Sequence, residues 1–358
     1  MKINLVGLDK VIITIFMITC QNILHGQVVS IQTRVLSQIS LPKNAIQRLL
    51  VQSGEKIQIG HILQSKDTLI VELPGKKSVK LPYRLQPIIS YNGSTIIQVG
   101  DKTMLDLPKH LDVYWINNDG KEKAVVANYY SGDARLDMSS DGYTGIGGTL
   151  LDKTSGSSIS IYSPLGTKLW ETMVANNRYV AQLNVTKLGS HVVIVTTDTL
   201  KKLDKHQIDI YDKSGNLTTE IKDIGIIQRI VFVGDESKFF FQGREYSGMV
   251  ETASGQIIWK NTGKVTLVSP YGAALSPDGT KLFLVVVQPG ERRTGFYQWK
   301  LIIINAVSGQ EIGSQTLNEK YPATWGRIYE SVTDSSVTLM AGNNHIAISI
   351  TLDKGGQR

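Results

Sequence analysis

A short phrase recurs along the chain: an apolar strand, two or three polar residues, a glycine, and then a second strand. The turn glycines are Gly120, Gly166, Gly215, Gly255 and Gly309, which lie 46, 49, 40 and 54 residues apart. A period in the forties, with several short strands and turns inside each unit, is typical of a propeller whose blades are the units. The repeat therefore predicts one closed all-β domain.

The unit over 265–317 shows the expected blade most clearly. Its first strand ends at Leu275 and is followed by the turn Ser276-Pro277-Asp278-Gly279, in which Pro and Gly suit a tight turn. The next strands are expected over 281–287, 299–305 and 311–317. The same frame fits earlier units back to one that spans 45–85, which gives six complete units.

The last unit is short, because it offers strands only over 328–332, 337–340 and 346–351 before the chain ends. A blade without its fourth strand exposes a sheet edge, which favours aggregation. The segment 28–36 is apolar enough to fill that edge. We therefore predict a seven-bladed β-propeller of four-stranded antiparallel blades, closed by an N-terminal strand that pairs beside 346–351.

The first residues have the pattern of an export signal, with Lys2 and Lys10 as its charges and a short apolar run over 11–19. That run is too short to span a membrane as a helix. We expect cleavage between Gly26 and Gln27, which makes 1–26 the export segment and 27–358 the propeller. The alternative is acylation of Cys20, as in a bacterial lipoprotein. The expected location is the periplasm, the cell surface or the medium, without a transmembrane span in the mature chain.

The chain is basic, with a net charge of +7 and a pI of about 9.2. No run of Lys and Arg exceeds two residues, so a diffuse basic surface is expected rather than a nucleic-acid site. Cys20 is the only cysteine, so cleavage after Gly26 would leave no disulfide. The hydrophobic core would then have to stabilise the exported domain.

Two motifs resemble known propeller repeats. In 251–259 an acidic residue precedes Ser-Gly, and Trp259 follows Gly255 by four residues, which resembles the repeat of quinoprotein-like propellers. Trp170 follows Gly166 at the same spacing, and 275–282 (LSPDGTKL) resembles the repeat of periplasmic WD40-like propellers. The resemblance is to this superfamily in a non-catalytic, exported form. Because Trp170 and Trp259 follow the turn glycine at one fixed spacing, we expect both to dock between neighbouring blades, and we expect Trp115, in the third strand of its blade, to be a core residue.

The sequence offers no catalytic constellation. The resemblance includes quinone-dependent dehydrogenases, which bind calcium and of which many have a vicinal disulfide, but a single cysteine excludes that disulfide. The histidines are scattered without ligand spacing, and we expect neither a cofactor nor a metal site. The glycine-rich run 145–148 lies inside a strand pattern, and we interpret it as a place where strands pack closely.

The loops that join the second to the third strand of a blade, and one blade to the next, should share one face, here called the loop face. The other connections form the turn face. The predicted loops hold ten cations and six acids, which leaves +4. The candidate ligand-binding residues on this face are Tyr129, Tyr130, Arg135, Arg178, Tyr179, Arg244, Tyr246, Arg292, Arg293, Tyr297, Trp325 and Arg327.

Arginine together with exposed tyrosine and tryptophan is typical of binding surfaces, and positive potential would steer an acidic partner. We therefore expect an exported, monomeric binding or scaffold module that engages a protein or a glycan through its loop face. The alternative is a secreted propeller hydrolase or lyase that acts at the axial channel. Titratable groups with shifted pKa that converge in one pocket would favour the enzyme.

Overall fold

The fold is taken from a computed structural model of the chain. It describes residues 29–38, 42, 44–53, 56–82, 87–100, 110–117, 120–130, 133–150, 156–198, 206–262, 267, 272–287, 296–322, 329–341 and 344–352. The predicted export segment, with Cys20, Gly26 and Gln27, lies outside these residues.

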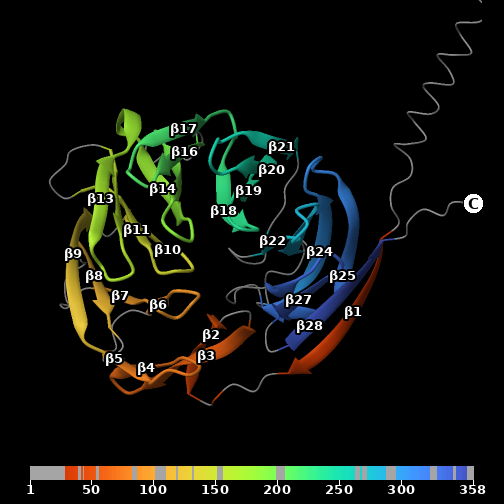
Figure 1. The fold of residues 1–358 in the computed structure, drawn as a ribbon, viewed down its shortest axis with the longest axis horizontal. Coiled ribbons are helices and arrows are strands. Elements are labelled where there is room, and N and C mark those ends of the chain that lie inside the picture. The colour runs from red at the N-terminus through yellow and green to blue at the C-terminus, as the bar shows by residue number, and fades with distance from the viewer. Residues whose placement is uncertain are drawn as a thin grey trace, which may run out of the picture.

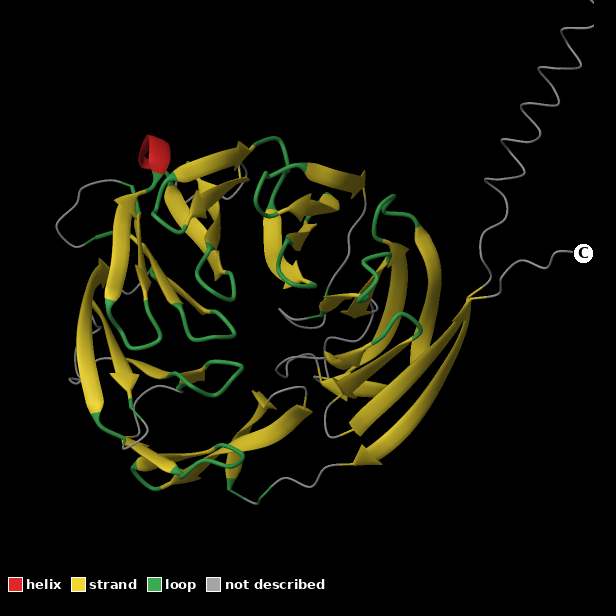
Figure 2. Ribbon diagram, viewed as in Figure 1, coloured by secondary structure: helices red, strands yellow, loops and turns green. Residues whose placement is uncertain are grey.

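The described strands form seven four-stranded sheets, arranged in a ring around a central axis (Figure 1). Neighbouring strands within each sheet are antiparallel. In the described part of the chain, the only helical segment is the short 3-10 turn η2 (Ala175–Asn177), drawn red in Figure 2. The predicted β-propeller is therefore confirmed.

We number the blades in chain order. Blade 1 contains β2 (Ala45–Ser53), β3 (Lys56–Ser65), β4 (Thr68–Glu72) and β5 (Val79–Pro82). Blade 2 contains β6 (Ile88–Ile89), β7 (Ile96–Gly100), β8 (His110–Ile116) and β9 (Glu122–Tyr130). Blade 3 contains β10 (Arg135–Met138), β11 (Thr144–Gly148), β12 (Ser158–Tyr162) and β13 (Lys168–Met173). Blade 4 contains β14 (Tyr179–Val185), β15 (His191–Thr197), β16 (His206–Asp212) and β17 (Leu217–Ile221).

Blade 5 contains β18 (Ile227–Val233), β19 (Lys238–Gly243), β20 (Tyr246–Glu251) and β21 (Ile257–Thr262). Blade 6 contains β22 (Ala273–Leu275), β23 (Lys281–Val287), β24 (Phe296–Asn305) and β25 (Glu311–Pro322). Blade 7 contains β26 (Tyr329–Val332), β27 (Ser336–Ala341), β28 (Asn344–Leu352) and β1 (Val29–Gln38).

The burial of the strands follows from their position in the blades. The first strand of a blade lies toward the axis and the fourth at the rim (Figure 1). Middle strands are covered on both faces by the neighbouring blades, so they read as continuous apolar runs, and six of the seven residues of β23 are buried. The rim strand β13 has one covered face, and its residues alternate between exposed and half-buried from Leu169 onward.

The N-terminal strand completes the last blade as predicted. β1 pairs with β28 over nine residue pairs, among them Ser30 with Thr351 and Val35 with Ile346. Strands from the two ends of the chain therefore share one sheet, and β1 covers the edge that β28 would otherwise expose.

Three tryptophans pack against the turn glycine of the next blade. A Cβ on Gly166 would lie 2.8 Å from the Trp115 ring, one on Gly215 would lie 2.8 Å from Trp170, and one on Gly309 would lie 2.6 Å from Trp259. The Trp259 Nε1–H also donates to the Ala306 carbonyl at 2.9 Å. Docking between blades is therefore confirmed for Trp170 and Trp259, and Trp115 is buried in the core at 3% exposure.

The glycine-rich run in β11 is a site of close packing, also as predicted. A Cβ on Gly145 would lie 2.5 Å from Leu183 Cδ2 and 2.7 Å from Val185 Cγ2. Both side chains belong to β14 of blade 4. The absence of side chains at the glycines of β11 thus lets the inner strand of the next blade approach closely.

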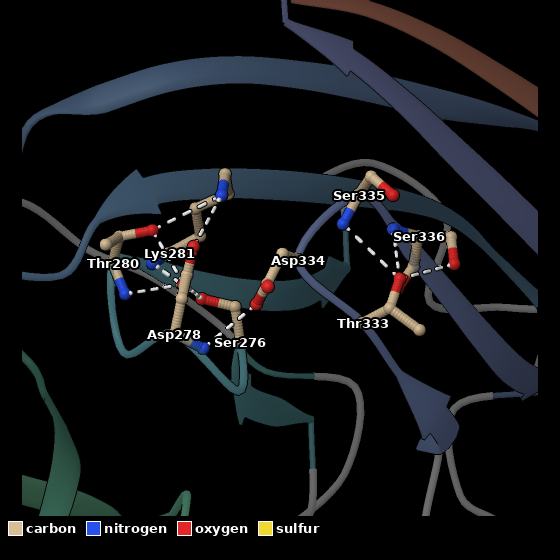
Figure 3. Close-up of polar contacts among 8 residues, drawn as sticks. All are labelled: Ser276, Asp278, Thr280, Lys281, Thr333, Asp334, Ser335 and Ser336. Atoms are coloured by element: carbon tan, nitrogen blue, oxygen red, sulfur yellow. Dashed lines mark hydrogen bonds and ion pairs between the residues drawn. The ribbon is translucent and has the colours of Figure 1, made fainter.

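Turns at the centre of the turn face connect neighbouring blades. Between blades 6 and 7, the Asp334 carboxylate accepts a hydrogen bond from the Asp278 backbone N–H at 2.9 Å (Figure 3). The Asp278 carboxylate itself accepts hydrogen bonds from the Ser276 hydroxyl at 2.5 Å and from the Thr280 hydroxyl at 2.7 Å. These bonds fix the turn that meets the closing blade.

Predicted loops over 242–248, 288–299 and 318–328 are shorter than the sequence suggested. Strands β24 and β25 extend beyond their expected ends, and Tyr297 pairs with Tyr321 across the ladder. In blade 5, β19 ends at Gly243 and β20 begins at Tyr246, so only 244–245 connect them. The predicted boundaries were wrong here because backbone pairing does not depend on the polarity of the side chains, and β24 and β25 stay paired even past the register shift between Gln298 and Lys300.

Candidate functional site

A cavity of about 440 Å³ lies between blades 4 and 5 on the loop face. Its volume is in the range that is typical of small-ligand pockets. Its wall comes from the start of β14, the end of β15, the start of β16, the connection after β17 and the turn between β19 and β20. The lining residues are Arg178, Asp198, His206, Gln207, Lys222, Asp223, Gly225, Glu245 and Tyr246.

Arg178 is held rigidly in the wall. It lies between η2 and β14 in an extended conformation, and its side chain is only 11% exposed. Its Nε donates to the Thr196 hydroxyl at 2.9 Å, its Nη2 donates to the Thr196 carbonyl at 3.1 Å, and its Nη1 is paired with the Asp198 carboxylate. Several bonds from one planar guanidinium fix both its position and its orientation.

A buried carboxylate supports the base of this wall. Asp209 lies in β16 between two isoleucines and is fully buried. It accepts hydrogen bonds from the Thr196 hydroxyl at 3.1 Å and from Gln207 Nε2 at 2.5 Å. Burial raises the pKa of the Asp209 carboxyl above its ordinary value, although these two bonds oppose the shift.

Gln207 links that buried carboxylate to a second, more exposed one. Its Nε2 also donates to Glu220 Oε1 at 3.2 Å, and Lys222 Nζ lies 3.0 Å from Glu220 Oε2. The hydrogen bond from Lys222 holds the pKa of the Glu220 carboxyl below its usual value. The two carboxyls therefore have pKa values shifted in opposite directions, but Asp209 is enclosed by the protein and cannot contact a ligand.

The side of the cavity toward blade 5 is formed by His206, Gly225, Glu245 and Tyr246. His206 Nδ1 accepts the backbone N–H of Ile227 at 2.9 Å, so the proton of the neutral ring is on Nε2 and the ring bridges the two blades. The Lys260 ammonium lies 4.7 Å from the centre of the Tyr246 ring and donates to the Asp223 carbonyl at 3.3 Å. This cation–π contact fixes the aromatic wall.

Two of the twelve sequence-predicted ligand-binding residues, Arg178 and Tyr246, line this cavity. Tyr179 is the half-buried neighbour of Arg178 at the start of β14, and Arg244 is exposed in the turn before Tyr246. The cavity thus brings together predicted ligand-binding residues from the loops of blades 4 and 5, and Tyr179 and Arg244 lie next to them in the sequence.

Other predicted residues lie elsewhere. Tyr129 is 2% exposed and its hydroxyl is 2.8 Å from the Ser160 hydroxyl, so it is a core residue between blades 2 and 3 and not part of the exposed surface. Tyr130 is 50% exposed, in blade 2. Arg135 Nε donates to the Ala181 carbonyl at 3.0 Å and joins blade 3 to blade 4, while Tyr297 is half-buried in β24 of blade 6. The candidates Arg292, Arg293, Trp325 and Arg327 lie outside the described residues.

Seven of the nine lining residues were not among the sequence-predicted ligand-binding residues, namely Asp198, His206, Gln207, Lys222, Asp223, Gly225 and Glu245. The supporting Asp209 was also missed. One signal was available in the sequence: Asp209 interrupts the apolar run of β16, and a carboxylate in a buried strand needs hydrogen-bond partners. Lys222 and Asp223 carry no such signal, since charged residues after a strand are common in any loop.

Three further observations concern a second cavity, metal binding and membrane spans. On the turn face, a second cavity of about 340 Å³ lies between blades 4 and 5, lined by residues that include Leu188, His191 and Glu251. Among the described residues, no group of three or more His, Cys, Asp or Glu side chains is arranged to hold a metal ion. No helix in the described part of the chain is long and apolar enough to cross a membrane.

No family model matches this chain, and neither does any curated protein. Among solved structures it is similar to "KlHsv2 with loop 6CD replaced by a Gly-Ser linker", with 11% identity, a TM-score of 0.52, and coverage of 85% of this chain and 98% of that one. It is also similar to BamB from Moraxella catarrhalis, with 11% identity, a TM-score of 0.47, and coverage of 92% and 100%. Identity at this level concerns the fold alone, and the first likeness agrees with the propeller described above.

Proposed function

We propose that the protein is an exported β-propeller binding or scaffold module that engages a protein or glycan partner through its loop face. The observation that carries this proposal is the cavity between blades 4 and 5, because five separate segments place polar side chains around one space. Such convergence of polar groups on a rigid scaffold is what recognition requires.

Binding is favoured over catalysis by the position of the titratable groups. Asp209 has the raised pKa that a general acid needs, but it is fully buried, and its bonds to Thr196 and Gln207 make it a support for the wall. A hydrolase or lyase would need at least two such groups in contact with the substrate.

Export is part of the proposal and follows from the sequence of residues 1–26. The mature chain would begin at Gln27 and act in the periplasm, at the cell surface or in the medium. Intact-mass measurement of the protein recovered from its producing cells tests this directly. A mass that begins at Met1 contradicts export by cleavage, and a lipid-modified mass at Cys20 identifies the lipoprotein alternative.

The binding function is tested by site-specific photo-crosslinking in the producing cells. A crosslinker in place of Arg244 reports on the loop face, and one in place of the exposed Lys213 reports on the turn face. We expect a defined product from position 244 only. The purified partner should then bind the parent chain and lose affinity for a Lys222→Ala/Arg244→Ala/Tyr246→Ala variant, while Lys213→Ala binds normally. Equal crosslinking from both faces, or unchanged affinity of the triple variant, contradicts the proposal.

A further inference from the structure

Arg178 and Lys222, the two cations that line the blade 4–5 cavity, already have partners within the protein, as does the neighbouring Lys260. Arg178 is paired with Asp198, Lys222 Nζ lies 3.0 Å from Glu220, and Lys260 is placed on the Tyr246 ring and the Asp223 carbonyl. A cation that is neutralised in this way attracts an anion weakly, because the neighbouring carboxylate repels it. The cavity is therefore poorly suited to an anionic ligand, despite the basic composition of the loop face.

Strong hydrogen-bond acceptors remain in the wall. Among the described residues, the carboxylates of Asp223 and Glu245 have neither an ion pair nor a hydrogen bond, and both line the cavity. Ionised carboxylates accept short, strong bonds from hydroxyl groups. The Lys222 ammonium has three donor positions, one of which is directed to Glu220, so donors are available beside these acceptors.

These carboxylates are not arranged for a cationic ligand. The Lys260 ammonium already occupies the position over the Tyr246 ring, 4.7 Å from its centre, and is anchored to the backbone of Asp223. That positive charge would repel a second cation that approached the Tyr246 ring or Asp223. The ligand that fits both constraints has no net charge and carries many hydroxyl groups, each able to donate and to accept.

We infer that this cavity binds a neutral saccharide unit, the end or a segment of an uncharged glycan. The inference rests on the proposed function and specifies its ligand. The Asp223 and Glu245 carboxylates accept hydrogen bonds from sugar hydroxyls, and the Lys222 ammonium donates a hydrogen bond to a sugar oxygen. The Tyr246 ring gives the wall an apolar patch. Arg178 and the buried Asp209 are positioning residues that keep the wall in place.

Gly225 provides a way to fill the cavity without altering its charges. It has a φ of +69°, and a Cβ there would lie 3.4 Å from Glu245 Oε2 and 3.4 Å from Tyr246 Cδ2, which are ordinary contact distances. Asparagine tolerates a positive φ better than other residues with a side chain. Gly225→Asn should therefore fold normally and place its amide in the space that the saccharide needs.

The experiment is calorimetric titration of the full chain with short neutral oligosaccharides of hexose and N-acetylhexosamine. Uronic-acid oligomers form an anionic arm and oligolysine a cationic arm. We expect a neutral oligosaccharide to bind, Gly225→Asn to abolish binding, and Glu245→Gln to weaken it about tenfold. Glu251→Gln, on the turn face, is the matched control and should bind like the parent. Thermal melting of each variant verifies that it is folded.

The inference is wrong if no neutral oligosaccharide binds, if Gly225→Asn leaves binding unchanged, or if a charged probe binds in preference. These outcomes are separate from the test of the proposed function. If the loop face is crosslinked to a protein and no neutral oligosaccharide binds, the binding module stands and the saccharide assignment fails. If both measurements are negative, both fail.

Discussion

The close approach of blades 3 and 4 at Gly145 gives a quantitative prediction of stability. A methyl group at this position would lie 2.5 Å from Leu183 Cδ2 and 2.7 Å from Val185 Cγ2, and Leu183 is itself buried at 6% exposure. Overpacking of this kind costs about 1–3 kcal/mol. Replacing Gly by Ala also restricts the unfolded chain, which offsets roughly 0.4–1 kcal/mol. We expect Gly145→Ala to lower the free energy of unfolding by about 1–2 kcal/mol.

A double-mutant cycle with Leu183→Ala identifies the cause. Leu183→Ala alone should cost about 2–5 kcal/mol, because it leaves a cavity between the blades. In the double variant, the methyl group introduced by Gly145→Ala occupies part of that cavity and no longer meets a leucine Cδ2. The double variant should therefore be more stable than the sum of the single effects predicts, with a coupling energy of about 1 kcal/mol.

Urea unfolding followed by tryptophan fluorescence measures all three variants, provided that the slope of the transition is unchanged. Gly147→Ala is the matched control, since its Cβ would lie no closer than 3.0 Å to Leu183 Cδ1 and the clash is milder. If Gly145→Ala is as stable as Gly147→Ala, or if the double variant is additive, the contact of Gly145 with Leu183 does not limit the packing of β11 against β14.

Three more perturbations have defined expected outcomes. Deletion of 29–38 removes β1 and exposes the edge of β28, so we expect aggregation and a lower melting temperature. Deletion of 353–358 is the control and should change neither. A chain that lacks 29–38 but melts like the parent contradicts the role of β1. Trp259→Phe removes the donor to the Ala306 carbonyl and should lower the free energy of unfolding by about 1–3 kcal/mol. Trp170→Phe should cost less, because Trp170 Nε1 has no hydrogen-bond partner among the described residues. Equal losses of stability in the two variants would exclude the Trp259 hydrogen bond as the cause. The pKa of the Asp209 carboxyl is raised in the folded state, so its contribution to stability is fully present below the unfolded-state pKa and is lost as pH rises through the folded-state pKa. Asp209→Asn should flatten this part of the stability–pH curve, measured by denaturant unfolding. An unchanged curve would show that Asp209 does not titrate in this range.

The order and bounds of the blades could be predicted from local sequence features. Apolar runs of strand length, the turn glycines and the turn over 276–279 are local features, so strand β23 was predicted over 281–287 and was found there. The missing fourth strand of the last unit also predicted the pairing of β1 with β28, because an uncovered sheet edge restricts where the remaining strand can go. These features follow from backbone geometry and from the alternation of side chains along a strand.

The residues of the candidate site could not be predicted in this way, because they come together only when the blades pack. The segments that line the blade 4–5 cavity are separated along the chain, and nothing in the local pattern around Lys222 or Asp223 indicates that they face Glu245. Tyr129 and Tyr246 both lie near strand ends, yet one is in the core and the other lines the cavity. Which side chains remain accessible depends on how adjacent blades pack, and that packing is a property of contacts between blades rather than of either blade alone.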